Sequence, residues 1–339
     1  MSKRVFDYGG VTRIGIECNP SLLERVSENL EAEVSVALDI DCLIRVDEVS
    51  PPVQIVKDKR FPYLTVDEDV KYGVKSVKYR RYDTHIRTIH QEGFGKYFVS
   101  TNICLDEESV LISIRDYIIN HPEFANGIFS HSSLVEIDGK GVLIVSEGRQ
   151  GKSTLAVYLL QERGATFVSD ENVILSSSEE GIRGLYFPRT PGVRFSAVSK
   201  SKLEKVLENL LLTRATQYID LDAIERIIES RSYHADAGLS FSRKALCELL
   251  GTTSKDSAVI DRVIFPRYNP SEDAVVHELT IKEGLKRLGK NGLIKRDKIE
   301  GKEFRSVSID LAEKGYEQIR FYELEFSGIG SLLRRGFRL

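Results

Sequence analysis

The sequence predicts an α/β fold: a mixed-sheet domain over residues 121–339, preceded by a β-rich α+β module over residues 1–120. Two observations favour this fold class. An apolar, β-branched run at residues 142–145 is followed by a glycine-containing loop and an amphipathic helix, which is the order of an α/β unit. A strand-like segment at residues 128–137 meets that run through a tight Asp-Gly turn at residues 138–139, so we expect a hairpin and not an all-parallel sheet.

Length and composition are typical of a globular protein with a full hydrophobic core. The chain has 339 residues, 41% hydrophobic and 29% charged, and its formal net charge of −3 argues against a general polyanion-binding character. The four cysteines lie far apart without metal-ligand spacing, so neither a zinc site nor a disulfide framework is expected. No stretch approaches the ~18 apolar residues of a membrane span, and the first ten residues lack the apolar part of a signal peptide. We therefore expect a cytoplasmic protein without a membrane partner.

Strand and helix patterns alternate within the N-terminal module. Residues 11–17 and 34–46 have strand composition, and residues 20–32 between them carry apolar residues at helical spacing. Strand-like patterning resumes at residues 70–90 and 97–104. The pattern predicts two or three further paired strands there.

A basic stretch lies within this module. Residues 71–90 hold six lysines and arginines against one acid, Asp83, with tyrosines interleaved among them. Such a face can bind an acidic peptide or a nucleic-acid backbone. The alternative, which we favour, is a solvated strand edge that lysine and arginine keep from aggregating.

The loop at residues 146–153 has the parts of a phosphate cradle. Gly148 and Gly151 permit positive φ, so that successive backbone N–H groups can converge on an anion. Lys152 supplies a positive charge, and the hydroxyl of one of the two residues after it can ligate Mg²⁺. The residues predicted to bind a nucleotide are Ser146, Glu147, Gly148, Arg149, Gln150, Gly151, Lys152, Ser153 and Thr154. The alternative is a surface turn between a strand and a helix.

The loop departs from the usual phosphate-loop pattern at two positions. Ser146 stands where the first glycine is expected, and Arg149 stands where a small residue fits best. The context nevertheless favours phosphate binding. The helix predicted over residues 153–163 points its positive N-terminal end at the same anion, carries leucines on one face and ends at Gly164.

An acidic pair, Asp170 and Glu171, occurs in the strand predicted after this helix. The carboxylate of Asp170 would come to the strand end beside the phosphates, where it can act as a general base or a metal ligand. A helix-capping or turn-forming aspartate is the alternative. Glu171 points to the opposite side if the strand stays regular. The predicted metal ligands are Ser153, Asp170 and Glu171.

The rest of the chain predicts a mixture of strands and helices. Strands are expected near residues 182–195, 262–268 and 318–326, and helices at 200–212, 221–229 and 243–250. A capping box at 280–283 is expected to open a short helix, and an exposed basic loop is expected at 282–305. Four arginines are candidate clamps for a phosphate group. They are Arg149, Arg183, Arg194 and Arg267.

Residues 130–185 resemble the catalytic domain of the HPr kinase/phosphorylase family, P-loop kinases whose fold is like that of phosphoenolpyruvate carboxykinase. The matching features are His131 before a strand, the hairpin turn, Gly-Lys-Ser at residues 151–153, a helix of about three turns, the acidic pair and Ile-Arg-Gly-Leu at residues 182–185. The resemblance implies an ATP-dependent kinase with ATP and Mg²⁺ as cofactors. By resemblance, its acceptor would be the hydroxyl group of a serine in a protein or a peptide, or that of a small molecule.

The resemblance also implies roles for single residues. Asp170 would be the general base, and His131 and Arg183 would belong to the catalytic site. Glu171 replaces a second aspartate of the family, and Gly181 replaces a glutamate, which leaves the reverse phosphorylase reaction and recognition of HPr without support. Two other functions stay open: a nucleotide-binding regulatory module without catalysis and, less favoured, a kinase acting on nucleic acid. A homo-oligomer also stays open.

Overall fold

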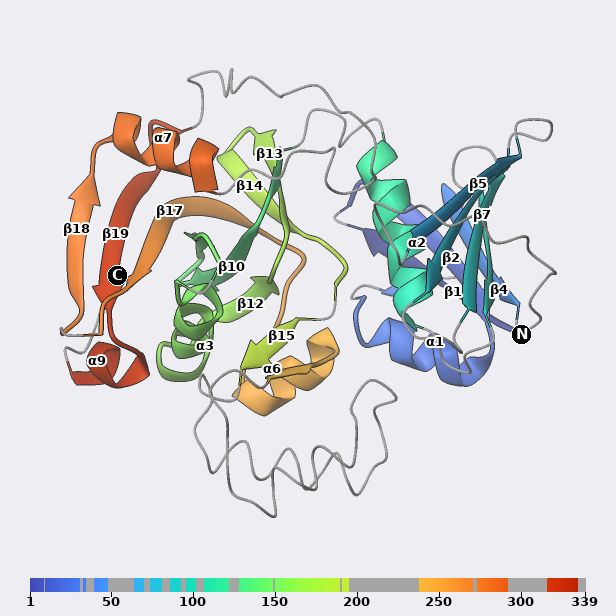
Figure 1. Cartoon of the computed structure of the whole chain (residues 1–339), viewed down its shortest axis with the longest axis horizontal. Helices are drawn as coiled ribbons and strands as arrows, with labels where there is room; N and C mark the ends of the chain where they lie inside the picture. The colour runs from blue at the N-terminus through green and yellow to red at the C-terminus, as the bar shows by residue number, and fades with distance from the viewer. Residues whose placement is uncertain are drawn as a thin grey trace, which may run out of the picture. The chain divides into compact units, whose positions relative to one another are not determined.

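The computed structural model (Figure 1) describes residues 1–8, 10–30, 33–34, 40–47, 64–69, 74–80, 86–92, 96–101, 107–121, 128–148, 150–189, 191–194, 238–270, 273–291 and 316–334. Contacts within the chain divide it into two compact units, Met1–Ala125 and Asn126–Leu339. Arg149 and the helices predicted at residues 200–212 and 221–229 lie outside the described residues. Among the helices that are described, none has both the length and the hydrophobicity to cross a membrane.

The N-terminal unit contains an eight-stranded mixed sheet in the order β3-β1-β2-β4-β8-β7-β6-β5. Its strands are β1 (Ser2–Tyr8), β2 (Thr12–Cys18), β3 (Glu33–Val34), β4 (Cys42–Asp47), β5 (Leu64–Asp69), β6 (Val74–Arg80), β7 (Ile86–Glu92) and β8 (Lys96–Thr101). β2, β4 and β8 are parallel neighbours, and the other pairs are antiparallel. The predicted basic stretch falls largely on β6 and β7. β6 pairs with β5 and β7, and β7 pairs with β6 and β8. The interpretation of the basic stretch as a sheet edge is therefore wrong for the part that the structure describes.

Two helices pack against this sheet. α1 (Pro20–Ser27) begins after Asn19, whose side chain accepts a hydrogen bond from the Leu22 N–H at 2.8 Å and so caps the helix. It contacts α2 (Glu107–Asn120), and an ion pair with little solvent exposure joins the two, with Arg25 Nε 3.0 Å from Glu107 Oε2.

The C-terminal unit contains a nine-stranded mixed sheet, which confirms a mixed α/β domain at the level of fold class. Its strands are β9 (Ile128–Ser130), β10 (Ser132–Ile137), β11 (Lys140–Val145), β12 (Thr166–Ser169), β13 (Val173–Ser178), β14 (Gly181–Tyr186), β17 (Ser257–Tyr268), β18 (Val275–Leu279) and β19 (Arg320–Phe326). The order is β12-β10-β11-β17-β14-β13-β9. In addition, β19 pairs with β17, and β18 pairs with β19. β11, β17 and β19 run parallel. A separate pair is formed by β15 (Gly192–Arg194) and β16 (Gly238–Ser240).

β10 and β11 form the predicted hairpin. Ile137 pairs with Lys140 in antiparallel register, and between them Asp138 and Gly139 have φ values of 51° and 75°. Positive φ at both central positions defines a type I′ turn, which Asp-Gly favours. The turn brings β11 into the interior of the sheet, between β10 and β17.

Helices cover both faces of the parallel strands. α3 (Lys152–Glu162) packs on one face in a hydrophobic cluster that includes Ile144 of β11. The neighbouring Leu143 points to the opposite face and belongs to a second cluster with Leu288 of α7 (Ile281–Asn291). Because successive residues of a strand alternate between faces, β11 is buried on both sides. α6 (Arg243–Leu250) and α9 (Ile329–Arg334) complete the described helices.

α7 shows that the exposed loop predicted for residues 282–305 is wrong over residues 282–291. The predicted capping box begins the helix: the Glu283 carboxylate accepts from the Thr280 N–H at 3.0 Å, and the Glu283 N–H donates to Thr280 Oγ1 at 3.3 Å. Leu285 and Leu288 then pack beneath the sheet. Two leucines one turn apart are too few to stand out among the surrounding lysines and arginines.

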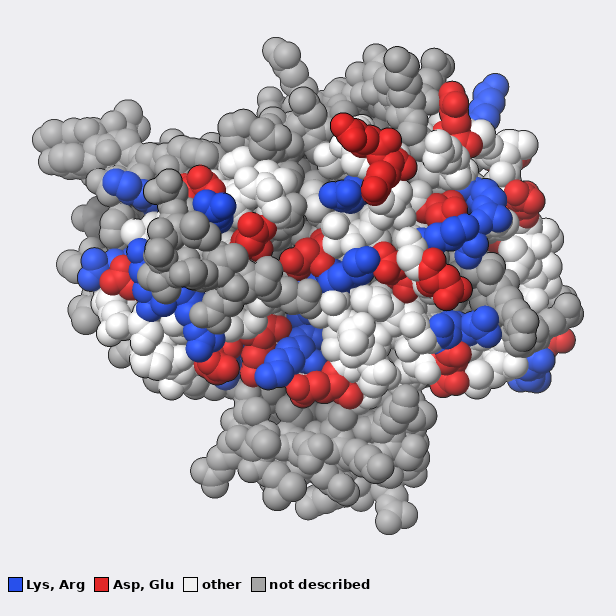
Figure 2. Space-filling model, turned by 180° about the vertical axis from the view of Figure 1, so that it is seen from behind, with Lys and Arg blue, Asp and Glu red and all other residues white. Residues whose placement is uncertain are grey.

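Charged side chains of both signs lie side by side on the described surface. On the face shown in Figure 2 no single large patch of either sign covers the described residues. Ion pairs account for part of this mixing, for example Arg320 Nη2 to Asp261 Oδ2 at 3.0 Å and Lys255 Nζ to Glu136 Oε2 at 2.6 Å. Such a surface agrees with the small net charge of −3.

Candidate functional site

The loop between β11 and α3 contains the predicted phosphate cradle. Gly151 is the N-cap of α3 and has a φ of 93°, which residues with side chains rarely adopt. A Cβ atom on Gly151 would lie 2.5 Å from the Phe326 ring, so only glycine allows this close approach. Gly148 has no positive φ, and an added Cβ would meet nothing within 4 Å. The expectation that both glycines supply positive φ is therefore met by Gly151 alone.

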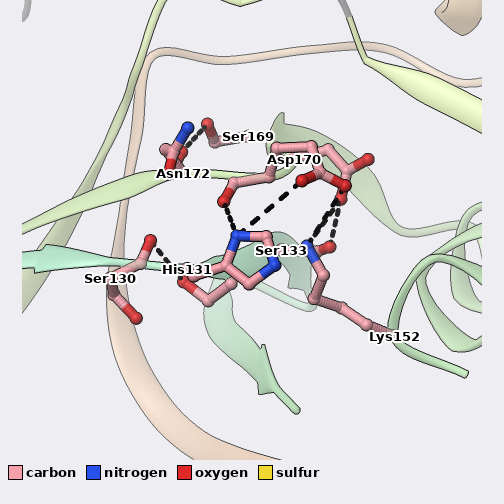
Figure 3. A network of polar contacts seen from close by, with 9 residues as sticks. Ser130, His131, Ser133, Lys152, Ser169, Asp170 and Asn172 are labelled. Carbon is pink, nitrogen blue, oxygen red and sulfur yellow. Dashed lines mark hydrogen bonds and ion pairs between the residues drawn. The ribbon is translucent and has the colours of Figure 1, made fainter. Parts of the chain in front are cut away.

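Lys152, the first residue of α3, lies at the centre of the site (Figure 3). Its side chain is 9% exposed, and Nζ lies 3.5 Å from Glu171 Oε1 and 3.8 Å from Asp170 Oδ1. Within the described part of the chain, this buried ammonium makes no hydrogen bond of ordinary geometry. Its charge is balanced by the two carboxylates, at distances longer than those of an ordinary hydrogen bond from an ammonium group.

Asp170 and Glu171 come directly after β12. The strand ends at Ser169, so the prediction that it continues through the acidic pair is wrong. The Asn172 N–H donates to the Asp170 carbonyl oxygen at 2.8 Å, and Glu171 between them has a φ of 67°, which makes a three-residue γ-turn. In a regular strand the two side chains would diverge, whereas this turn brings both carboxylates within 4 Å of Lys152 Nζ.

Neighbouring serines hold the γ-turn in place. A non-glycine residue at positive φ costs about 1–3 kcal/mol and persists only where its surroundings fix it. Ser169 Oγ donates to the Asn172 carbonyl oxygen at 2.6 Å and accepts from the Phe187 N–H at 3.2 Å. Ser133 Oγ, on β10, donates to Asp170 Oδ1. These bonds fix both the turn and the direction of the Asp170 carboxylate.

His131 contacts the γ-turn from the segment between β9 and β10 (Figure 3). Its Nδ1 lies 2.8 Å from the Glu171 carbonyl oxygen, which can only accept, so Nδ1 carries the proton and Nε2 holds the lone pair of the neutral ring. Burial and the charge of Lys152 lower the pKa of His131, against the opposing effect of Glu171. The ring is therefore mainly neutral at pH 7.

The pKa of Glu171 is lowered chiefly by Lys152, and His131 adds to this effect only while its ring is protonated. Burial alone would raise the pKa of Glu171, but Lys152, His131 and Arg189 together hold it below its usual value. Arg189 follows β14 and also reaches the turn: its Nη1 lies 3.1 Å from the Asn172 side-chain oxygen, when that amide is oriented so that its nitrogen donates to the Glu171 carbonyl.

Arg189 and Ser133 belong to the site although neither was predicted. Ser133 had a usable signal, because it lies two residues after His131 and residues at this spacing share one face of a strand. Arg189 had none. Only the path of the chain after β14 brings it to the turn, and no spacing rule connects it with Asp170.

The predicted metal ligands Ser153, Asp170 and Glu171 suit Mg²⁺. Among the residues that the structure describes, no cluster of three or more His, Cys, Asp or Glu side chains could cage a metal ion. Mg²⁺ commonly uses one or two carboxylates together with phosphate oxygens and water. Two carboxylates facing the start of α3, where Ser153 lies half-buried, meet that requirement.

The other predicted loop residues line the path from β11 to α3. Ser146 is buried, and its hydroxyl has no hydrogen-bond partner in the described structure. Glu147 is exposed, and Thr154 is half-buried in the first turn of α3. Gln150 Oε1 accepts a hydrogen bond from the Tyr268 N–H at 3.2 Å, which ties the loop to the end of β17.

The two predicted arginine clamps whose side chains the structure describes, Arg183 and Arg267, pair with other acidic residues. Arg183 lies on β14 and pairs with Glu180 at 3.5 Å, with 40% of its side chain exposed. Arg267, at the end of β17, pairs with Glu325 at 3.1 Å. The side chain of Arg194 lies outside the described part of the chain. Arg183 therefore stays a prediction without a contact that supports it.

Comparisons with known proteins add little to this geometry. No family model matches the chain, and no curated protein matches it. Among solved structures, the Hpr(Ser) kinase/phosphatase from Coxiella burnetii is similar at 14% sequence identity, over 61% of this chain and 88% of that chain, with a TM-score of 0.26.

Proposed function

We propose that this protein is an ATP-dependent kinase that transfers the γ-phosphate to a hydroxyl group of a protein, a peptide or a small molecule. The observation that carries the proposal is the buried Lys152 ammonium, at the N-terminal end of a helix, with two carboxylates within 4 Å and no hydrogen bond of ordinary geometry among the described residues. Phosphoryl transfer needs positive charge, a metal and an oriented acceptor more than it needs covalent chemistry.

Nucleotide phosphates would bind where the loop meets α3. The predicted loop residues, Ser146 to Thr154, offer backbone N–H groups, and the N-terminal end of α3 adds its partial positive charge. Lys152 would exchange its carboxylate contacts for phosphate oxygens. Bound Mg²⁺ would neutralise charge on the phosphates. Ser153, Asp170 and Glu171 would hold it.

Asp170 is our candidate for the general base. Ser133 donates to its Oδ1 and so leaves Oδ2 to accept the proton of an acceptor hydroxyl. Its side chain is only 7% exposed, which limits competition from water. His131 and Asn172 hold the γ-turn that presents it. Among the described arginines, Arg189 has a charge that lowers the pKa of both His131 and Glu171, so we add it to the proposed site.

Nucleotide binding is tested by titrating ATP and Mg²⁺ into the protein and following the heat of binding. Lys152→Ala should weaken the affinity at least about tenfold, since it removes a buried charge directed at the phosphates. Lys140→Ala removes the same charge at the opposite end of β11, where Lys140 is 53% exposed, and should bind like wild type. Equal affinities of wild type and Lys152→Ala would overturn the phosphate-loop assignment.

Phosphate transfer is tested with labelled ATP and a panel of hydroxyl acceptors: free serine, serine peptides, sugars and oligonucleotides. Labelled product from one acceptor class, lost in Lys152→Ala, supports a kinase and identifies its substrate class. Tight nucleotide binding with no transfer to any of them would instead favour the non-catalytic regulatory module. Transfer to oligonucleotides alone would favour a nucleic-acid kinase.

A further inference from the structure

The two sides of the phosphate loop hold different groups. Asp170, Glu171 and Ser133, the polar groups of the site, come from β10 and the end of β12, which lie on one side of β11 in the sheet. β17 and β19 lie on its other side. Under the proposed function, on which this inference rests, the transferred phosphate faces the first side. The nucleoside then extends toward the second.

β17 and β19 end beside the loop. Both run parallel to β11, and ligands of such sheets bind outside the carboxyl ends of the strands. Phe326, the last residue of β19, lies against Gly151. Its register partner on β17 is Tyr268, whose N–H donates to the Gln150 side chain at 3.2 Å. Tyr268 is therefore linked to the loop in two ways: through Phe326, its partner on β19, which lies against Gly151, and through its own hydrogen bond to Gln150.

The Tyr268 ring is presented on the α3 side of the sheet. Alternate residues of a strand share a face, and Ile264 of β17 packs in the cluster beneath α3, so Tyr268 belongs to that face. Arg267 points to the opposite face and pairs with Glu325. Tyr268 is 52% exposed, whereas Phe326 beside it is 1% exposed. The Tyr268 ring thus lies at the edge of the core beside the loop, and its exposed part is accessible to a ligand.

We propose that the exposed ring of Tyr268 stacks on the base of the bound nucleotide and forms the nucleobase subsite of this loop. Stacking uses the π-face that every base possesses, so the subsite should accept adenine and guanine alike. An isolated exposed aromatic is common on protein surfaces, and its function here follows from its place at the end of a parallel strand, beside the loop.

The test compares ligands with and without a base. Tyr268→Ala should weaken ATP and GTP about 5- to 100-fold, as loss of one aromatic–base stack does elsewhere, while binding of inorganic tripolyphosphate stays as in wild type. Tyr268→Phe keeps the ring and should bind ATP like wild type. The backbone N–H of residue 268 survives both changes, so the hydrogen bond to Gln150 is retained. Val276→Ala, at another exposed apolar residue of the same unit, is the matched surface control.

A fluorescent base supplies a second readout. Stacking quenches 2-aminopurine, so its triphosphate should dim on binding to wild type and Tyr268→Phe but not to Tyr268→Ala. Equal loss of ATP and tripolyphosphate in Tyr268→Ala would mean that the loop itself is disturbed, and unchanged ATP affinity would mean that the base lies elsewhere; either overturns the proposal. If wild type binds neither ATP nor tripolyphosphate, the proposed function itself fails.

Discussion

Each unit of the protein contains a buried polar cluster, and the two clusters are built differently. In the N-terminal unit the buried hydroxyls of Thr12 and Tyr117 lie 2.9 Å apart, and Thr12 also donates to Asp41 at 3.3 Å. Burial raises the pKa of Tyr117, so its hydroxyl stays protonated. In the C-terminal unit, Lys152 Nζ lies 3.5 and 3.8 Å from two carboxylates without a hydrogen bond of ordinary geometry.

The cluster of the N-terminal unit can only stabilise its fold, whereas the cluster of the C-terminal unit can also bind a ligand. In the first cluster each hydroxyl has a partner at hydrogen-bond distance. The second keeps donor capacity unused and contains Glu171 at a φ of 67°, a strained conformation. Buried polar groups without a hydrogen bond and strained backbone conformations occur most often at functional sites.

Asp170→Asn should have the largest effect on the C-terminal cluster. We expect phosphate transfer to fall at least about 100-fold, because a positioned base commonly contributes that much or more. Tripolyphosphate without Mg²⁺ should bind more tightly, since one negative charge beside the anion is removed. The measurements are a transfer assay and a calorimetric titration. A wild-type transfer rate would contradict the assignment of the base.

Gly151→Ala should destabilise the loop and the C-terminal unit together. The added methyl group meets the Phe326 ring at 2.5 Å and φ is 93°, so overpacking and a left-handed backbone together should lower the free energy of unfolding by about 2–4 kcal/mol. Urea unfolding measures this. Gly148→Ala, with no atom within 4 Å of the new methyl, should change little. Phe326→Leu in the Gly151→Ala background should restore part of the loss if the clash is its cause.

Tyr117→Phe should affect the N-terminal cluster alone. Removing the phenolic hydroxyl leaves Thr12 with one partner fewer, and we expect the free energy of unfolding to fall by about 1 kcal/mol. ATP affinity should not change. A loss of ATP binding in this variant would show that the two clusters are coupled, and the contrast between them would then fail.

The smallest effect concerns pH. The pKa of His131 is lowered, so its neutral form contributes stability that is complete above pH 6.5 and is lost as pH falls from there toward the lowered value. Glu171, also lowered, contributes stability above pH 4.5 that is lost below it. Thermal unfolding across pH 3–8 should therefore show decreasing stability on acidification. His131→Asn should flatten the upper part of the curve, and Glu171→Gln the lower part. An unchanged curve in both variants would contradict these shifts.

The hairpin, the loop and α3 could be predicted because their signals are local. Asp-Gly at residues 138–139 specifies the turn, and α3 was placed within one residue at each end. Gly164, expected to end the helix, has a φ of 63°. Each signal lies within a few residues of the feature that it determines, so no knowledge of the tertiary structure was needed.

The remaining features depend on contacts between distant segments. The shared direction of Asp170 and Glu171 comes from a γ-turn that Ser169 fixes locally and that Ser133 fixes from β10, whereas the residue types alone predict a regular strand. Arg189 reaches the site only because β14 leads to it. The described part of the basic stretch lies on interior strands because β5 and β8 flank β6 and β7, which its composition could not reveal.

The long strand β17 also determines when the loop can take shape during synthesis. β10 and β11 are neighbours in the chain and can pair as soon as both have left the ribosome, but the parallel partner of Leu143 is Val263, and Gly151 packs on Phe326. Contacts between residues so far apart in sequence form late. In a nascent chain that ends before β17, the Gly-Lys-Ser segment at residues 151–153 lacks the strands that hold the loop. Under the proposed function, a loop competent to bind ATP therefore forms only after β17 and β19 have been translated.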